Sequence, residues 1–102
     1  MEPVVESKRE AIAEICRRFH VKRLEVFGSA ARGDFDPRTS DVDLLVEFEK
    51  DRPGSALGTF FGFKEALEEL FGRSVDLVEE GAIRNPYLRK GIDASRELLY
   101  AA

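Results

Sequence analysis

The apolar positions of this chain follow helical spacing in some segments and strand-like runs in others, with polar breaks between them. Helical spacing with charged residues on the opposite face predicts two amphipathic helices, over residues 5–19 and 57–71. Short runs rich in valine, leucine and phenylalanine predict three strands, over residues 21–27, 42–48 and 74–79. We expect a last helix that starts at Pro86 and includes Ile92, Leu98 and Leu99.

Glycines and polar residues mark the ends of these elements. Gly28 ends the first strand, residues 29–33 are expected to form one helical turn, and residues 34–39 form a polar loop that contains proline. Gly72 is placed to end the second long helix in the left-handed conformation that glycine tolerates. The order of helix, strand, turn, strand, helix, strand and helix predicts an α/β fold.

Length and charge limit the possible functions. The chain has 102 residues, 43% of them hydrophobic, without an internal repeat or linker, so we expect residues 1–102 to form one domain. A formal net charge of -4 argues against a protein that binds nucleic acid mainly through its backbone phosphates. Any phosphate that it binds is expected to be small, bound locally and assisted by a metal ion.

The cysteine content and the apolar runs predict the cellular compartment. Cys16 is the one cysteine, which excludes an intrachain disulfide, and no cluster has zinc-ligand spacing. The first residues lack a signal-peptide pattern, and no apolar run is long enough to cross a bilayer. We therefore expect a cytoplasmic protein that does not engage a membrane.

Two aspartates, Asp41 and Asp43, stand at the start of the second predicted strand. Because side chains alternate along a strand, both carboxylates share one face. The opposite face is expected to pack in the core and carries Val42, Leu44, Val46 and Phe48. Roughly 6 to 7 Å of strand separates the two aspartates, and their repulsion is on the order of 2 to 3 kcal/mol at an effective dielectric of about 20. A cation between them would offset this repulsion.

The carboxylates indicate which cation is favoured. Oxygen ligands without a nearby histidine favour a hard divalent ion such as Mg²⁺, which completes its coordination with water and substrate phosphate. Asp76 interrupts the apolar residues of the third predicted strand, and we expect it to add a third carboxylate from an adjacent strand. Such a carboxylate can share a metal ion and accept the proton of an attacking hydroxyl.

A glycine-serine pair follows the first predicted strand. Gly28 would let the backbone approach a phosphate, while Ser29 adds a hydroxyl donor at the start of a helical turn. Arg32 follows one turn later and could meet the same phosphates with a bidentate contact. Gly33 then leads into the loop.

Two better-known motifs approach this pattern and fail. Gly28 and Gly33 have the outer spacing of a Walker A loop, but an Asp-Phe pair stands where Lys and Ser or Thr are required. Asp34 and Asp36 resemble the start of a calcium-binding loop, but Thr39 stands in place of its glycine.

One known family has a similar combination of residues. This chain resembles the minimal nucleotidyltransferases, which are small members of the polymerase-beta-like superfamily. The residues that match their signature are Gly28-Ser29, Arg32-Gly33, Ser40-Asp41-Val42-Asp43-Leu44 and the later Asp76. This resemblance implies a core with a small mixed β-sheet flanked by helices. It also implies an enzyme that binds magnesium and ATP and transfers a nucleotidyl group with release of pyrophosphate.

The same resemblance implies roles for the matching positions. Asp41 and Asp43 would bind metal in what we expect to be a two-metal site, and Asp76 would be the shared ligand and candidate base. Residues that would bind the nucleotide or shape its site are Gly28, Ser29, Arg32 and Ser40.

The resemblance also implies a partner. Small proteins of this family are commonly antitoxins paired with a HEPN-domain ribonuclease toxin, and some inactivate the toxin by adenylylating a tyrosine. A second interpretation is a binding module that neutralises a partner without catalysis. It depends on Phe60, Phe61 and Phe63, because one helix cannot bury all three against a small sheet if Phe61 points well away from Phe63. We expect Phe61 to be exposed and to contact a partner or a second copy of the chain.

Overall fold

A four-stranded mixed sheet in the order β3-β2-β1-β4 forms the centre of the molecule. The computed structural model describes residues 2–33, 36 and 41–102. The strands are β1 (Val21–Phe27), β2 (Val42–Phe48), β3 (Val75–Glu79) and β4 (Glu97–Ala101). The helices are α1 (Pro3–Glu6), α2 (Arg9–Arg18), α3 (Ser29–Arg32), α4 (Ala56–Phe71) and α5 (Pro86–Ser95), with a 3₁₀ turn, η1 (Glu80–Ala82). Strand β2 is antiparallel to β1 and parallel to β3, whereas β4 is antiparallel to β1.

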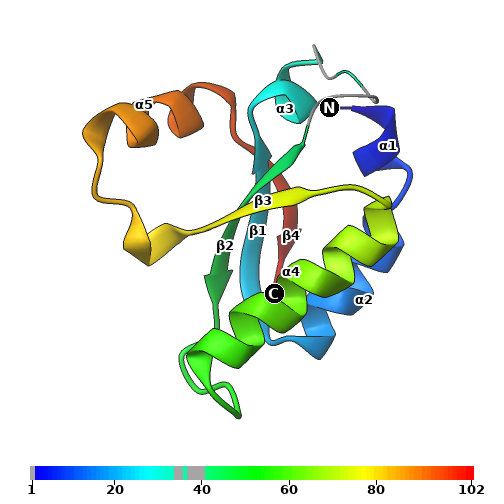
Figure 1. Ribbon diagram of the computed structural model, residues 1–102, viewed down its shortest axis with the longest axis vertical. Coiled ribbons are helices and arrows are strands. Elements are labelled where there is room, and N and C mark those ends of the chain that lie inside the picture. The colour runs from blue at the N-terminus through cyan, green and yellow to red at the C-terminus, as the bar shows by residue number, and fades with distance from the viewer. Residues whose placement is uncertain (1, 34–35, 37–40) are drawn as a thin grey trace.

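The helices cover the two faces of this sheet unequally. Helices α2 and α4 lie away from α5, with the strands between them (Figure 1). The main core lies on the side of α2 and α4, and includes Ile12, Cys16, Phe63, Leu67, Val42, Leu44, Val46 and Phe48. On the other side, Ile92 of α5 packs in a small cluster with Phe27 and Leu45. The predicted core face of β2 is confirmed, and its second face is partly covered by α5.

Most of the predicted elements are confirmed. The three predicted strands correspond to β1, β2 and β3, and the predicted helical turn is α3. The hydroxyl of Ser55 accepts a hydrogen bond from the Gly58 amide at 2.9 Å and caps α4, which ends at Gly72 with φ of 66°. Cys16 is buried, and burial raises the pKa of its thiol to about 12, with Arg17 acting in the opposite direction. It is therefore a core residue.

Two predictions about the ends of the chain are wrong. The predicted helix over residues 5–19 is interrupted at Ser7 and Lys8, between α1 and α2. The predicted last helix ends at Ser95, and Leu98 and Leu99 belong to strand β4. A short apolar segment joins whichever element offers it hydrogen bonds and a buried face, and here β1 has a free edge that β4 occupies. No helix of the described residues is long and apolar enough to cross a membrane.

Candidate active site

The parallel pairing of β2 and β3 places two of the candidate carboxylates side by side. Asp43 is the register partner of Asp76 on β3, and on its other side it is the partner of Phe27 at the end of β1. Asp41 precedes β2 and is exposed, as is Asp76, whereas Asp43 is half-buried. The prediction that Asp76 lies on the strand adjacent to Asp43 is confirmed.

The turn after β1 lies against Asp43. Gly28 has φ of 69° and ψ of -149°, a conformation that side chains rarely adopt. A Cβ atom at Gly28 would overlap Oδ2 of Asp43. Only glycine therefore allows β1 to turn this close to the carboxylate.

Helix α3 carries the next candidate residues away from this turn. The carbonyl of Gly28 accepts hydrogen bonds from the amides of Ala31 and Arg32, both at 3.1 Å. Ser29 is half-buried at the first position of α3, and Gly33 ends the helix with φ of 91°. The structure thus brings Gly28, and with it the start of α3, next to Asp43.

The carboxylates and Arg32 act on one another electrostatically. The pKa of Asp43 is raised from 3.8 to about 6, first because burial disfavours the charged form and then because Asp76 and Asp41 carry like charge. Arg32 lowers the pKa of Asp43. A bound cation would stabilise the ionised forms of these carboxylates, so the charge distribution suits a positively charged ligand.

The donor chemistry also fits a divalent metal ion. Within residues 2–33, 36 and 41–102, no three carboxylate, histidine or cysteine side chains already lie close enough together to hold an ion. The three aspartates nevertheless offer oxygen donors only, and they interact without a histidine or a thiol among them. Asp41, Asp43 and Asp76 are therefore the residues that could hold such an ion after side-chain adjustment.

The remaining candidates have different outcomes. Arg32 is exposed at the end of α3, and its charge lowers the pKa of Asp43. Ser40 lies outside the described residues, as does the predicted loop apart from Asp36.

Sequence reasoning missed one group of residues beside this site. Glu25 is buried in β1, two residues before Phe27, and is hydrogen-bonded to Arg96 at the end of α5. An acid that interrupts the apolar residues of a strand is the signal that singled out Asp76, and Glu25 has the same signal in the run RLEVF. Its arginine partner is 71 residues away, which no local pattern indicates.

A mixed sheet that carries carboxylates on adjacent strands beside a glycine-serine turn is the arrangement expected of a nucleotidyltransferase. Residues 8–99 match the family model described as a nucleotidyltransferase domain. The chain therefore belongs to the nucleotidyltransferase domain family, and it is an enzyme of the nucleotidyltransferase class.

Similar proteins narrow this class. MJ0128 from Methanocaldococcus jannaschii, provisionally named a protein adenylyltransferase, is 41% identical over 83 residues, which cover 81% of this chain and 79% of the relative. The protein adenylyltransferase MntA from Thermococcus cleftensis is 37% identical over 87 residues, which cover 85% of this chain and 81% of the relative.

Solved structures share the fold. One, provisionally described as a minimal nucleotidyltransferase, superposes with a TM-score of 0.75 at 38% identity and covers 95% of each chain. Another contains a tri-AMPylated Shewanella oneidensis HEPN toxin in complex with an MNT antitoxin. It superposes with a TM-score of 0.66 at 15% identity, over 96% of this chain and 73% of that one. The second likeness shows the fold alone.

Proposed function

We propose that this protein transfers AMP from ATP to a hydroxyl group of a partner protein. The observation that carries the proposal is the register pair of Asp43 and Asp76 beside the turn at Gly28. The names of the relatives support the nature of the transferred group and of the acceptor, since both MntA and MJ0128 are named as protein adenylyltransferases.

The proposed partner is a HEPN-type ribonuclease toxin, and the protein would then act as its antitoxin. The complex of an AMPylated HEPN toxin with an MNT antitoxin supports this choice, as does the net charge of -4, which does not favour nucleic acid as the acceptor.

The candidate residues divide the work of this reaction. Asp41 and Asp43 would hold Mg²⁺, with Asp76 as a further ligand. When bound, the metal ion would neutralise charge on the phosphates of ATP. Ser29 and Arg32 would bind the triphosphate through a hydroxyl and a guanidinium group, and Ser40 would shape the start of β2.

The transfer step needs a proton acceptor near the incoming hydroxyl. The hydroxyl oxygen of the partner would form a bond to the α-phosphorus as the bond from that phosphorus to pyrophosphate breaks. Asp76 is exposed on β3 and would accept the hydroxyl proton, and pyrophosphate would leave with the electron pair of the broken bond.

The test compares transfer of AMP to the partner by wild type and by the Asp41→Asn, Asp43→Asn double variant. We expect wild type to modify the partner and the double variant to leave it unmodified, because amide groups do not replace two carboxylate ligands. Transfer at the wild-type rate by the double variant would contradict the proposed site.

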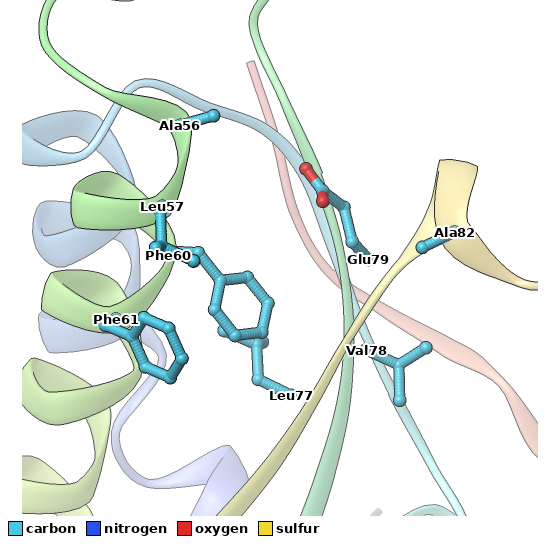
Figure 2. A pocket seen from close by; sticks show the side chains of 8 residues that line it. All are labelled: Ala56, Leu57, Phe60, Phe61, Leu77, Val78, Glu79 and Ala82. Carbon is cyan, nitrogen blue, oxygen red and sulfur yellow. The ribbon is translucent and has the colours of Figure 1, made fainter.

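A second candidate function is neutralisation of the partner by binding alone. It is favoured by an apolar groove of about 550 Å³ between α4 and β3, lined by Ala56, Leu57, Phe60, Phe61, Leu77, Val78, Glu79 and Ala82. Figure 2 shows Leu57, Phe60 and Phe61 along α4, across from Leu77 on β3. Leu57 and Phe61 are 68% and 55% exposed, as expected for Phe61. In this case the double variant would still silence the partner.

A further inference from the structure

The end of α5 is fastened to the end of β1 by two separate sets of hydrogen bonds. The amide of Gly28 donates to Oγ of Ser95 at 3.0 Å. One residue later, Arg96 donates from Nε to Oε2 of Glu25 at 2.8 Å and from Nη2 to Oε1 at 2.6 Å. The two sets lie on either side of Phe27, whose partner in the sheet is Asp43.

Glu25 is a strong anchor because its charge is buried. The residue is 4% exposed, and Arg23 donates to its Oε1 at 2.9 Å in addition to the two bonds from Arg96. A buried carboxylate that loses its cationic partner is strongly destabilised, so Arg96 cannot easily leave. Arg96 is further held by Asp93 at 2.6 Å and by Glu80 at 3.3 Å.

The other attachments of α5 lie further from Ser95. Arg89, six residues before Ser95, donates to Oε1 of Glu80 at 2.6 Å. Ile92 is the buried residue of this helix, and it packs against Phe27 and Leu45. The bidentate contact between Arg96 and Glu25 therefore fixes the backbone next to Ser95. The hydroxyl of Ser95 lies 3.5 Å from the carbonyl of Gly91, and donation in that direction would leave an oxygen lone pair for the Gly28 amide.

The position of Gly28 matters because it is the point of contact between the turn and Asp43. Its backbone is in a conformation open mainly to glycine, and it packs directly against the Asp43 carboxylate. A change in the place of Gly28 would alter the separation between Asp43 and Ser29 at the start of α3.

We propose that Ser95 is a positioning residue that holds the turn at Gly28 and Ser29 in place relative to Asp43, and that the ion pair of Glu25 with Arg96 holds Ser95. Ser95 does not touch the nucleotide; it sets the geometry in which the turn binds the phosphates. The inference rests on the proposed role of Gly28 and Ser29 in nucleotide binding.

The experiment compares binding of Mg²⁺ with a non-hydrolysable ATP analogue, by calorimetry, among three serine variants. Ser95→Ala removes the acceptor for Gly28, and Ser95→Thr keeps a hydroxyl. Ser55→Ala is the matched control, because Oγ of Ser55 also accepts a hydrogen bond from a glycine amide, at 2.9 Å. Ser55 caps α4, which follows the end of β2 that lies away from Asp43. The unfolding temperature of each protein is measured without nucleotide.

We expect Ser95→Ala to weaken binding by up to about five- to tenfold, because binding must then order a turn that the hydrogen bond holds in place in wild type, and the cost is limited by the worth of that one bond. Ser95→Thr should restore the affinity to within about twofold of wild type. Ser55→Ala should lower the unfolding temperature and leave the affinity of the folded protein unchanged. Equal affinities of Ser95→Ala and wild type would overturn the inference, even if the variant is less stable.

A double-mutant cycle tests the link from Glu25 to Ser95. Glu25→Gln should weaken binding of the analogue in the wild-type background and add little in the Ser95→Ala background, because both changes act through one contact. Independent, additive effects would overturn the link. Failure of wild type itself to bind the analogue would contradict the proposed function, which distinguishes that failure from failure of the positioning role.

Discussion

The space left by the missing side chain of Gly28 is occupied by the carboxylate of Asp43. The glycine adopts a backbone conformation that other residues rarely adopt, and its missing side chain makes room for a carboxylate whose charge is itself disfavoured by burial. Residues that depart in this way from their local preferences are expected where function, rather than stability, selects them.

Gly28→Ala tests this fit. We expect the variant to unfold more easily by about 1 to 3 kcal/mol, because alanine is strained at this φ and ψ. It should also lose nucleotide affinity, since the Asp43 carboxylate would have to rotate away from the new Cβ. The measurements are urea unfolding and calorimetric titration with the ATP analogue.

Gly91→Ala is the control for this change. Gly91 lies within α5, and a Cβ there meets no atom within 4 Å, so alanine should stabilise the protein by about 0.5 to 1 kcal/mol. Equal changes in stability and nucleotide affinity for Gly28→Ala and Gly91→Ala would contradict the proposed fit between Gly28 and Asp43.

The buried ion pair of Glu25 predicts a dependence of stability on pH. Hydrogen bonds from Arg96, and secondarily from Arg23, hold the pKa of Glu25 below its ordinary value of 4.5, although burial acts in the opposite direction. A lowered folded-state pKa gives stability that is present above the unfolded value and is lost as the pH falls through the folded value. Glu25 should therefore contribute at pH 7 and lose this contribution progressively below about pH 4.5.

The measurement is the free energy of unfolding of wild type and Glu25→Gln, at pH 7 and at pH 3. At pH 7 the variant should be less stable by about 1 to 3 kcal/mol, since two guanidinium groups lose a charged acceptor. This difference should shrink at pH 3. A difference that stays constant over this range would show that the charge of Glu25 does not stabilise the fold.

The sequence indicates single residues of the site better than it indicates their partners. Asp43 and Asp76 could be recognised because an acid interrupts an apolar strand, and Gly28 because a glycine ends one. Ser95 could not, because its hydroxyl gains a role only when α5 is placed against Gly28, 67 residues away in the chain.

At the scale of elements, the two sides of α4 have different roles. Its buried side carries Phe63, Leu67 and Phe71 into the core, whereas Phe61 points away from that core and its ring lies 5.3 Å from that of Phe60. The exposed side forms one wall of the groove beside β3 (Figure 2). The groove is therefore the surface of α4 that is open to a partner.

Phe61→Asp tests this surface. The side chain is 55% exposed, so we expect the free energy of unfolding to change by no more than about 1 kcal/mol. The complex with the proposed HEPN-type partner should weaken at least about tenfold, because a charge would be desolvated at an apolar contact. Binding is measured by calorimetry with the purified partner.

Tyr87→Asp provides the matched control, since Tyr87 is 85% exposed on α5 and the same change of polarity occurs away from the groove. It should leave the affinity for the partner unchanged. Equal affinities of Phe61→Asp and wild type would exclude the groove as the docking surface.

The elements that carry their own periodic pattern could be predicted, and those that depend on neighbours could not. Strands β1 and β2 and helix α4 were evident from apolar spacing with a glycine or a cap at the end. The sequence predicts helix where β4 forms, because Leu98 and Leu99 fit either spacing; the free edge of β1 favours the strand. The apolar spacing also does not predict the parallel register of β2 with β3, which aligns Asp43 with Asp76.

At the scale of the whole molecule, the sheet brings together the turn at Gly28 and the aspartates of β2 and β3. Its order, β3-β2-β1-β4, places the start of β2 between the end of β1 and the start of β3, so that Asp43 lies between the turn at Gly28 and Asp76. Helix α5 lies across the sheet from α2 and α4 (Figure 1), and its Ile92 covers part of the opposite face at Phe27 and Leu45. The class of enzyme follows from this arrangement and from the family match over residues 8–99.

The most direct test of the account is the intact mass of the proposed HEPN-type partner after co-expression. The partner is expressed with wild type, with the Asp41→Asn, Asp43→Asn variant, and with a control that carries Glu49→Gln and Asp51→Asn. The control removes two carboxylate charges at the opposite end of β2, where both residues are exposed. We expect whole adenylyl units on the partner with wild type and with the control, and none with the aspartate variant. An unmodified partner that all three proteins bind and silence would contradict the account and identify a binding antitoxin.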